Sequence, residues 1–286
     1  MTDSDLNSQP EEPPSNLKSP LALAISAILA LIPVSSDPDP LSIQSVCART
    51  FWAEKFARLA MDRVDADFEY LEPANGFSQP EFNVSTVPTM GRPHFHPEVP
   101  IQLESIFALI LLSSYEHNHR GNVLKMRNRA GQAFIAAKSL RLHCLGEEEH
   151  IFAEAQRRAW WMTFYCMCQC SIVSHDGFSI IDEDDSSLDT PYPILTSDPD
   201  IWGLFISAEK ALVATVRFTA RFRSLLMNTH GTPIPKDFNR MQQLDQMISS
   251  LIANINALPP ISTASDKLCS LTSQNLRLLT RIKLNR

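Results

Sequence analysis

Apolar residues recur at helical spacing along most of this chain, and proline-rich segments separate the stretches that carry them. Repeats of three, four and seven residues place apolar side chains on one face of an α-helix, whereas a half-buried strand needs strict alternation. No alternating stretch of useful length occurs. Proline breaks helix interiors, so the prolines mark where the helices end. The pattern therefore predicts an all-α, multi-helix domain of stacked helix pairs.

The first expected helix is an apolar run at 21–32, which lies between Pro20 and Pro33. Pro20 fits the first helical turn, where its missing N–H costs little. The other expected helices, each with an apolar face, cover 41–71, 101–115, 123–143, 147–174, 200–228, 237–257 and 266–284.

Two of these boundaries follow from local chemistry. Residues 116–121 resemble a turn, and Gly121 is the expected stop after the helix that begins at 101. Three consecutive glutamates at 147–149 suit the positive N-terminal end of a helix dipole, so the next helix is expected to open there.

Three segments are expected to be irregular. Residues 1–16 are acidic and proline-rich with little to bury, which predicts a disordered lead before a helical domain at 17–286. Residues 72–100 hold six prolines in 29 positions, which predicts a Pro-rich loop insertion. Residues 176–200 are acidic and contain three prolines, which predicts an acidic loop.

The charge balance disfavours direct nucleic-acid binding. The 286 residues include 25 Lys+Arg and 32 Asp+Glu, for a formal charge of −7, whereas phosphate contact needs an excess of cations. Two groups of basic residues are the best candidates for phosphate contact, and we interpret both as lying on the polar sides of amphipathic helices. They are Arg217, Arg221 and Arg223, and Arg277, Arg281, Lys283 and Arg286.

Other classes of protein are disfavoured by composition. Only eight glycines occur, and neither of the glycine-rich phosphate-binding motifs G-x-G-x-x-G and G-x-x-x-x-G-K-[ST] is present. Nucleotide-binding folds that use these motifs are therefore disfavoured. The longest apolar run is shorter than the roughly 20 residues of a membrane span, so no membrane association is expected. Six cysteines are too few for a disulfide scaffold of this size, which favours a reduced, intracellular compartment.

The cysteines and histidines do not form a convincing metal site. Cys166, Cys168 and Cys170 are spaced by two, and two helical residues turn the chain by about 200°, so only Cys166 and Cys170 share a face. Two thiols alone make a poor zinc site, which takes four ligands, and we interpret them as core packing. Two histidine pairs are interpreted as exposed loop residues: His94 with His96, and His117 with His119.

No catalytic constellation stands out. The run Asp182–Asp185 could hold Mg²⁺ against a diphosphate, as in class I terpene synthases, but the second metal motif of that family is missing. Residues 159–209 contain nine acids and no Lys or Arg, and this charge repels a diphosphate. Neither G-x-S-x-G nor H-E-x-x-H occurs. We therefore assign no catalytic, cofactor-binding or metal-ligating residue, and we expect that the chain is not an enzyme.

Two segments nevertheless carry a recognisable order of motifs. The first runs from Leu109–Tyr115 through Gly121 and Gly131-Gln132-Ala133 to Leu140-Arg141-Leu142-His143. The second runs from Arg157-Arg158-Ala159-Trp160-Trp161 through Asp182-Glu183-Asp184 to Pro191-Tyr192-Pro193. Together they resemble the fungal-specific transcription factor domain, the middle homology region of fungal binuclear zinc cluster transcription factors. The resemblance covers residues 20–230. In that family an Ala-rich helix closes on Leu-Gly-Leu-His, so Arg141 stands where the family has glycine.

This resemblance implies the regulatory domain of a nuclear transcription regulator. Its implied partners are proteins, either the transcription machinery or a homologous factor, with DNA contacted only indirectly and a small-molecule effector as a further class. The family's N-terminal Cys-x2-Cys-x6-Cys cluster does not occur in this chain. Zinc is therefore expected only in a missing cluster, and the chain is expected to be a truncated regulator or to act through a partner.

Two alternatives to a transcription regulator stay open: an all-α small-molecule enzyme with an unrecognised site, and a helical scaffold or interaction domain. Two residue-level hypotheses also follow. Arg157 or Arg158 is expected to pair with Asp182 or Asp184. Neighbouring helical residues point about 100° apart, so the two residues Trp160-Trp161 either both pack in the core or include one that borders a groove.

Overall fold

The computed structural model describes residues 18–71, 92–147, 150–174, 189–228, 235–261 and 267–284. These ranges contain eight α-helices and no strand, which confirms the all-α prediction. The helices are α1 (Pro20–Leu29), α2 (Ile43–Leu71), α3 (Ile101–Asn118), α4 (Val123–Ser139), α5 (Ala153–Ser174), α6 (Ile201–Asn228), α7 (Pro235–Ala257) and α8 (Lys267–Leu284). The chain divides into two compact units, Met1–Leu111 and Leu112–Arg286, and each is described by itself.

Most helix boundaries lie within two residues of their predicted positions, and four differ by more. α1 ends at Leu29 rather than at 32. α3 continues to Asn118, so the predicted turn at 116–121 begins too early, although Gly121 follows it with a φ of 61°. α4 ends at Ser139 rather than at 143.

The largest error is at the start of α5, which begins at Ala153 rather than at 147. The backbone N–H of Ala153 donates to the His150 carbonyl at 2.9 Å, and the Phe152 N–H donates to the His150 ring at 3.2 Å. His150 therefore satisfies the first donors of this helix, whereas the prediction assigned the opening to the glutamates on dipole grounds alone.

The predicted loops are described only in part. Residues 92–100 and 189–200 are irregular, in agreement with the predictions for 72–100 and 176–200. The lead at 1–16 and the rest of those two segments lie outside the described residues.

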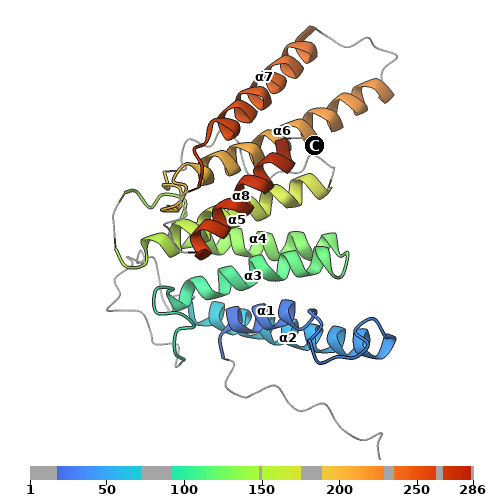
Figure 1. Ribbon diagram of the computed structural model, residues 1–286, viewed down its shortest axis with the longest axis vertical. Helices are drawn as coiled ribbons and strands as arrows, with labels where there is room; N and C mark the ends of the chain where they lie inside the picture. Colours follow the sequence, from blue (N-terminus) through green and yellow to red (C-terminus); the bar gives the residue numbers. More distant parts are fainter. Residues whose placement is uncertain are drawn as a thin grey trace, which may run out of the picture. The chain divides into compact units, whose positions relative to one another are not determined.

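The first unit packs α1 along α2 (Figure 1). The buried faces of both helices are rich in alanine, and small side chains let two helix backbones approach closely. The fully buried alanines of this pair are Ala24 and Ala27 on α1 and Ala53 and Ala60 on α2. Ser19 begins α1 as its N-cap, because its side chain accepts the N–H of Ala22 at 3.2 Å.

Glu104 on α3 is completely buried and accepts three hydrogen bonds. Ser19 Oγ donates to Oε2 at 2.7 Å, and the backbone N–H of Phe95 donates to Oε1 at 2.8 Å. The guanidinium of Arg92 donates to Oε2 as well. This carboxylate therefore joins the start of α1 and the irregular segment before α3 to α3 itself.

Arg92 also binds a second buried carboxylate, Asp67 on α2, at 2.7 Å, and Ser105 Oγ donates to the same Asp67 oxygen at 2.7 Å. Burial lowers the pKa of Arg92, but its hydrogen bonds to Asp67 and Glu104 and their negative charges outweigh that effect, so the pKa is raised. One cation thus pairs with two buried carboxylates.

Replacing Arg92 with methionine should therefore destabilise the first unit. Arg92→Met keeps an apolar stem of similar length but leaves both carboxylates buried without a cation, which costs about 3–5 kcal/mol of unfolding free energy. Urea denaturation followed by circular dichroism measures the loss. Arg58→Met, at an exposed position of α2, is the matched control and should leave the midpoint nearly unchanged. Equal effects of the two substitutions would refute the role of the buried cation.

The second unit is a stack of helices in which α4 packs on α5, α5 on α6, and α6 on both α7 and α8 (Figure 1). Glu209 on α6 is completely buried, and its carboxylate pairs with Lys283 of α8 at 2.5 Å and accepts a hydrogen bond from Gln169 of α5. The Lys283 ammonium lies 5.0 Å from the centre of the Tyr165 ring.

The C-terminal basic residues are therefore not all on the polar side of α8. Lys283 points inward to Glu209, and Arg277 pairs with the buried Asp198 at 2.5 Å. These ion pairs join α8 to α6 and to the segment before it. The sequence pattern could not show this, because the two acids lie far from α8 along the chain.

α4 ends in a Schellman motif whose left-handed residue is Arg141 instead of the usual glycine. The N–H of Leu142 donates to the Ala137 carbonyl at 3.0 Å, and the N–H of Arg141 donates to the Lys138 carbonyl at 2.9 Å. Arg141 has a φ of 56°, the left-handed region that glycine occupies without steric cost. This is the position at which the resembling family has glycine.

Arg141→Gly should stabilise the protein by about 1 kcal/mol, because glycine removes the Cβ contact that disfavours a left-handed backbone. Arg141→Ala keeps a Cβ and should bring no such gain. Urea midpoints of the two variants and the parent chain provide the comparison. A glycine variant no more stable than the alanine variant would contradict the assignment.

Candidate functional site

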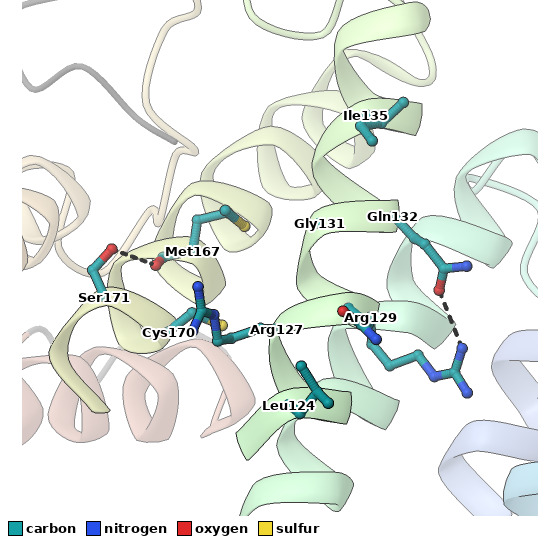
Figure 2. Close-up of a pocket in the computed structure, with 10 residues that line it drawn as sticks. Leu124, Arg127, Arg129, Gly131, Gln132, Ile135, Met167, Cys170 and Ser171 are labelled. Atoms are coloured by element: carbon teal, nitrogen blue, oxygen red, sulfur yellow. Dashed lines mark hydrogen bonds between the residues drawn. The ribbon is translucent and has the colours of Figure 1, made fainter. Parts of the chain in front are cut away.

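A pocket of about 540 Å³ lies between α4 and α5, a volume within the range of small-molecule sites (Figure 2). The α4 residues that line it are Leu124, Arg127, Asn128, Arg129, Gly131, Gln132 and Ile135, and the α5 residues are Met167, Cys170 and Ser171.

The lining combines apolar side chains with cationic and amide groups. Arg129 donates to Gln132 Oε1 at 3.2 Å, and Ser171 Oγ donates to the Met167 carbonyl at 3.3 Å (Figure 2). Gly131 leaves the wall open, because a Cβ at this position would meet nothing within 4 Å. The ionisable groups of the described lining are the guanidiniums of Arg127 and Arg129 and the thiol of Cys170.

The motifs of the resemblance meet near the other end of α4, in a set of contacts that we call the motif junction. It consists of Leu142, His143, Trp160, Trp161, Asp189, Thr190, Pro191 and Tyr192. Thr190 Oγ1 donates to the Leu142 carbonyl at 2.6 Å and accepts the Leu145 N–H at 3.3 Å. The Asp189 N–H donates to the His143 carbonyl at 2.9 Å. These bonds attach the segment before α6 to the end of α4.

The two tryptophans complete the motif junction from α5. Trp161 Nε1 donates to the Pro191 carbonyl at 2.9 Å, and its ring lies 4.5 Å from the Tyr192 ring, centre to centre. The Trp160 ring lies 5.8 Å from the His143 ring. Both tryptophans are buried, Trp160 completely and Trp161 to within 4% of full burial. Burial raises the pKa of Tyr192.

Other residues singled out by the sequence are not brought into one site. His94 and His96 are exposed in the irregular segment before α3, as predicted. His119 is exposed in the turn that follows α3, as predicted, whereas His117 differs from the prediction because it lies within α3. Arg158 pairs with Glu154, one turn earlier on α5, at 2.7 Å. Asp182 and Asp184, one of which we expected to pair with Arg157 or Arg158, lie outside the described residues.

The three α5 cysteines are buried, and Cys166 and Cys170 share a packing cluster with Met126 and Ala130 of α4. Sequence reasoning found the shared face of the two thiols. It missed the pocket, because the spacing of residues within one helix does not show which other helix will lie beside it.

Comparison of the chain with protein-family models, with curated proteins and with solved structures finds no match. Among the described residues, no helix is long and apolar enough to cross a membrane. The same residues contain no group of three or more His, Cys, Asp or Glu side chains placed to hold a metal ion.

The motif junction yields a graded prediction. Trp161→Phe removes the bond to the Pro191 carbonyl but keeps a ring, and should cost about 1–2 kcal/mol, whereas Trp161→Ala should cost about 3–5 kcal/mol. Hydrogen exchange should show faster exchange at residues 189–195 in Trp161→Phe. Trp52→Phe, at a half-buried position of α2, is the control. Unchanged exchange at 189–195 would show that the indole does not hold this segment.

Proposed function

We propose that the chain is a regulatory domain of the fungal zinc cluster type of transcription regulator, without its own DNA-binding cluster, that works in the nucleus through protein contacts. The proposal assigns no reaction to the chain. DNA is reached indirectly, through a partner or a further DNA-binding segment, because this acidic chain carries no cluster of the kind that binds DNA in that family.

The observation that carries the proposal is the motif junction. Three motifs of the resemblance, separated by up to 50 residues, contact one another: the Leu142-His143 closure, the Trp160-Trp161 pair and the Pro191-Tyr192 segment. The contacts support the proposal because they bring these three motifs together in one place. The left-handed φ at Arg141, where the family has glycine, supports the same proposal.

Exposed apolar side chains on the last two helices support action through protein partners. Clustered apolar exposure on a folded protein is typical of interaction surfaces. The large apolar residues at least 38% exposed on these helices are Phe238, Met241 and Met247 of α7 and Leu271, Leu278, Leu279 and Ile282 of α8. The same observation favours a helical scaffold, which is our second candidate function.

A small-molecule effector is the other partner class that we propose, and the pocket between α4 and α5 is where it would bind. The enzyme alternative needs a cavity with converging acid and base groups. The ionisable groups that line this pocket are two guanidiniums and one thiol, which suit binding of an anionic or amphipathic molecule better than proton transfer.

The proposal predicts transcriptional activity when the chain is brought to a promoter. Fused to an unrelated DNA-binding domain, the full chain should raise or lower a reporter relative to that domain alone, and the untagged chain should accumulate in the nucleus. Thr190→Val, which removes both bonds of the Thr190 hydroxyl within the motif junction, should weaken the reporter response. A chain that leaves the reporter unchanged and stays outside the nucleus would exclude the proposal and favour the scaffold.

Two matched variants sharpen that experiment. Thr219→Val makes the same substitution at an exposed position of α6, where the hydroxyl bonds only within its own helix, and should leave the response intact. Gly131→Leu fills the pocket without a backbone clash, so it should change the response if an effector acts there. Ser139→Leu, exposed at the end of α4, is its control.

A further inference from the structure

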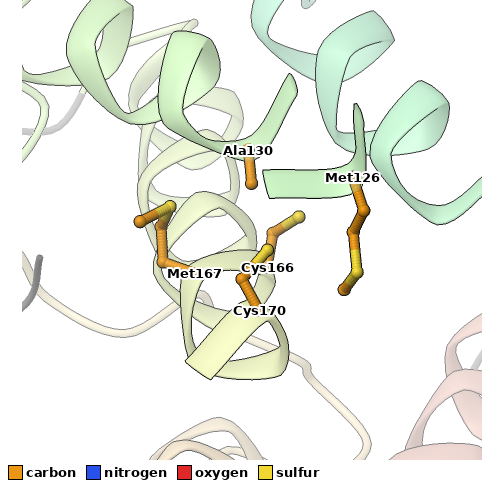
Figure 3. Packing of buried hydrophobic residues seen from close by; sticks show 5 residues of the cluster. All are labelled: Met126, Ala130, Cys166, Met167 and Cys170. Atoms are coloured by element: carbon orange, nitrogen blue, oxygen red, sulfur yellow. The ribbon is translucent and has the colours of Figure 1, made fainter. Parts of the chain in front are cut away.

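Four sulfur-containing side chains gather where α4 packs on α5, and we call them the sulfur cluster. They are Met126 of α4 and Cys166, Met167 and Cys170 of α5, each at least 95% buried. Figure 3 shows the two thiols between the side chains of the two methionines. Thiol and thioether sulfur are soft ligands, which select Cu(I) over harder cations.

The two thiols are held in fixed positions. Cys166 and Cys170 are one turn apart on α5 and lie in the same packing cluster. The Cys166 thiol also donates to Ser113 Oγ at 3.3 Å, and Ser113 Oγ donates to the Met126 carbonyl at 2.9 Å. Residues of α3 and α4 thus hold the Cys166 thiol in place before any ligand arrives.

A positive charge lies beside this pair. Arg127 is close enough to Cys170 to favour its thiolate, and Figure 2 shows the guanidinium next to the Cys170 sulfur. A Cu(I) ion that displaced the thiol protons would form a bound anion, and Arg127 lies close enough to Cys170 to balance its charge.

The sulfur cluster is reached from the pocket, because Met167 and Cys170 line both. The pocket therefore gives a small cation or its carrier a route to sulfurs that are otherwise shielded. Zinc fits poorly, since it takes four ligands and the described residues offer no group of three His, Cys, Asp or Glu side chains.

We propose that Cys166 and Cys170 bind one Cu(I) ion at the base of the pocket between α4 and α5, with Arg127 as the counter-charge. Binding forms two Cu–S bonds and breaks two S–H bonds. Two protons leave to solvent, the bound complex carries one negative charge, and no electron is transferred. The proposal depends on this geometry alone and holds whether or not the chain regulates transcription.

Anaerobic competition with a coloured Cu(I) chelator, bathocuproine disulfonate, tests this site on the full, reduced chain. The parent protein should withdraw one equivalent of copper. Cys166→Ser and Cys170→Ser should each weaken retention by more than about 100-fold, because the loss of a ligand exceeds the effect of outer-shell changes. Cys168→Ser removes a buried thiol from another face of the same helix and should retain the copper.

A second variant, in which Cys47, Cys144 and Cys269 are all replaced by serine, should also retain one equivalent of copper. This result would exclude binding by those three thiols. Copper K-edge absorption of the parent protein gives a readout that does not depend on folding of the variants, and should show a shell of sulfur alone.

Four results would overturn the proposal: no copper withdrawn by the parent chain, equal loss in Cys168→Ser, nitrogen or oxygen in the copper shell, or loss of two titratable thiols without bound copper. The last result would mean that the pair forms a disulfide instead. None of these readouts involves transcription, so the site and the proposed function fail independently.

Discussion

Each unit of this protein depends on a carboxylate that is completely buried on a helix and must be neutralised there. Glu104 of α3 and Glu209 of α6 have no access to water, and an unpaired buried charge would cost several kcal/mol. Arg92 supplies the compensating charge for Glu104 from the irregular segment before α3, and Lys283 supplies that for Glu209 from α8. The arrangement of each unit is therefore fixed by charge as much as by apolar packing. Displacing α8, or the segment 92–95, would leave a buried carboxylate without its cation and so destabilise the unit.

This constraint also explains what the sequence could and could not predict. Helix positions followed from apolar periodicity, which is a local property, and seven apolar stretches gave correct helices or nearly so. The burial of Glu104 and Glu209 could not be predicted from this periodicity, because a glutamate at a core position resembles a surface residue until its partner is known. The late start of α5 has a related cause. The three glutamates satisfied a dipole rule, but His150 supplied the actual contacts at the helix start.

For the same reason, only part of the candidate site could be predicted from the sequence. The 100° step of an α-helix correctly put Cys166 and Cys170 on one face and Cys168 on another. It could not show that Ser113 of α3 and Met126 and Arg127 of α4 would approach that face, because these residues lie on other helices, 39 or more positions before Cys166 in the sequence. The pocket has the same origin: α4 contributes most of the lining, and α5 contributes the sulfurs.

The motif junction links these observations to function. Under the function proposed above, the domain must hold an ordered core while one surface responds to a ligand or partner, and the candidate regions for these two tasks lie on different parts of α4 and α5. Near the end of α4, the Trp161 bond to Pro191 and the Thr190 bond to Leu142 join α4, α5 and the segment before α6. Nearer its start, α4 faces α5 across a pocket whose wall is open at Gly131. A ligand that changed the spacing of α4 and α5 at the pocket would act on helices already fixed at the junction. The ligand would therefore tilt α4 and α5 slightly about that fixed end. Because α6 packs on α5, this tilt would be transmitted to α6.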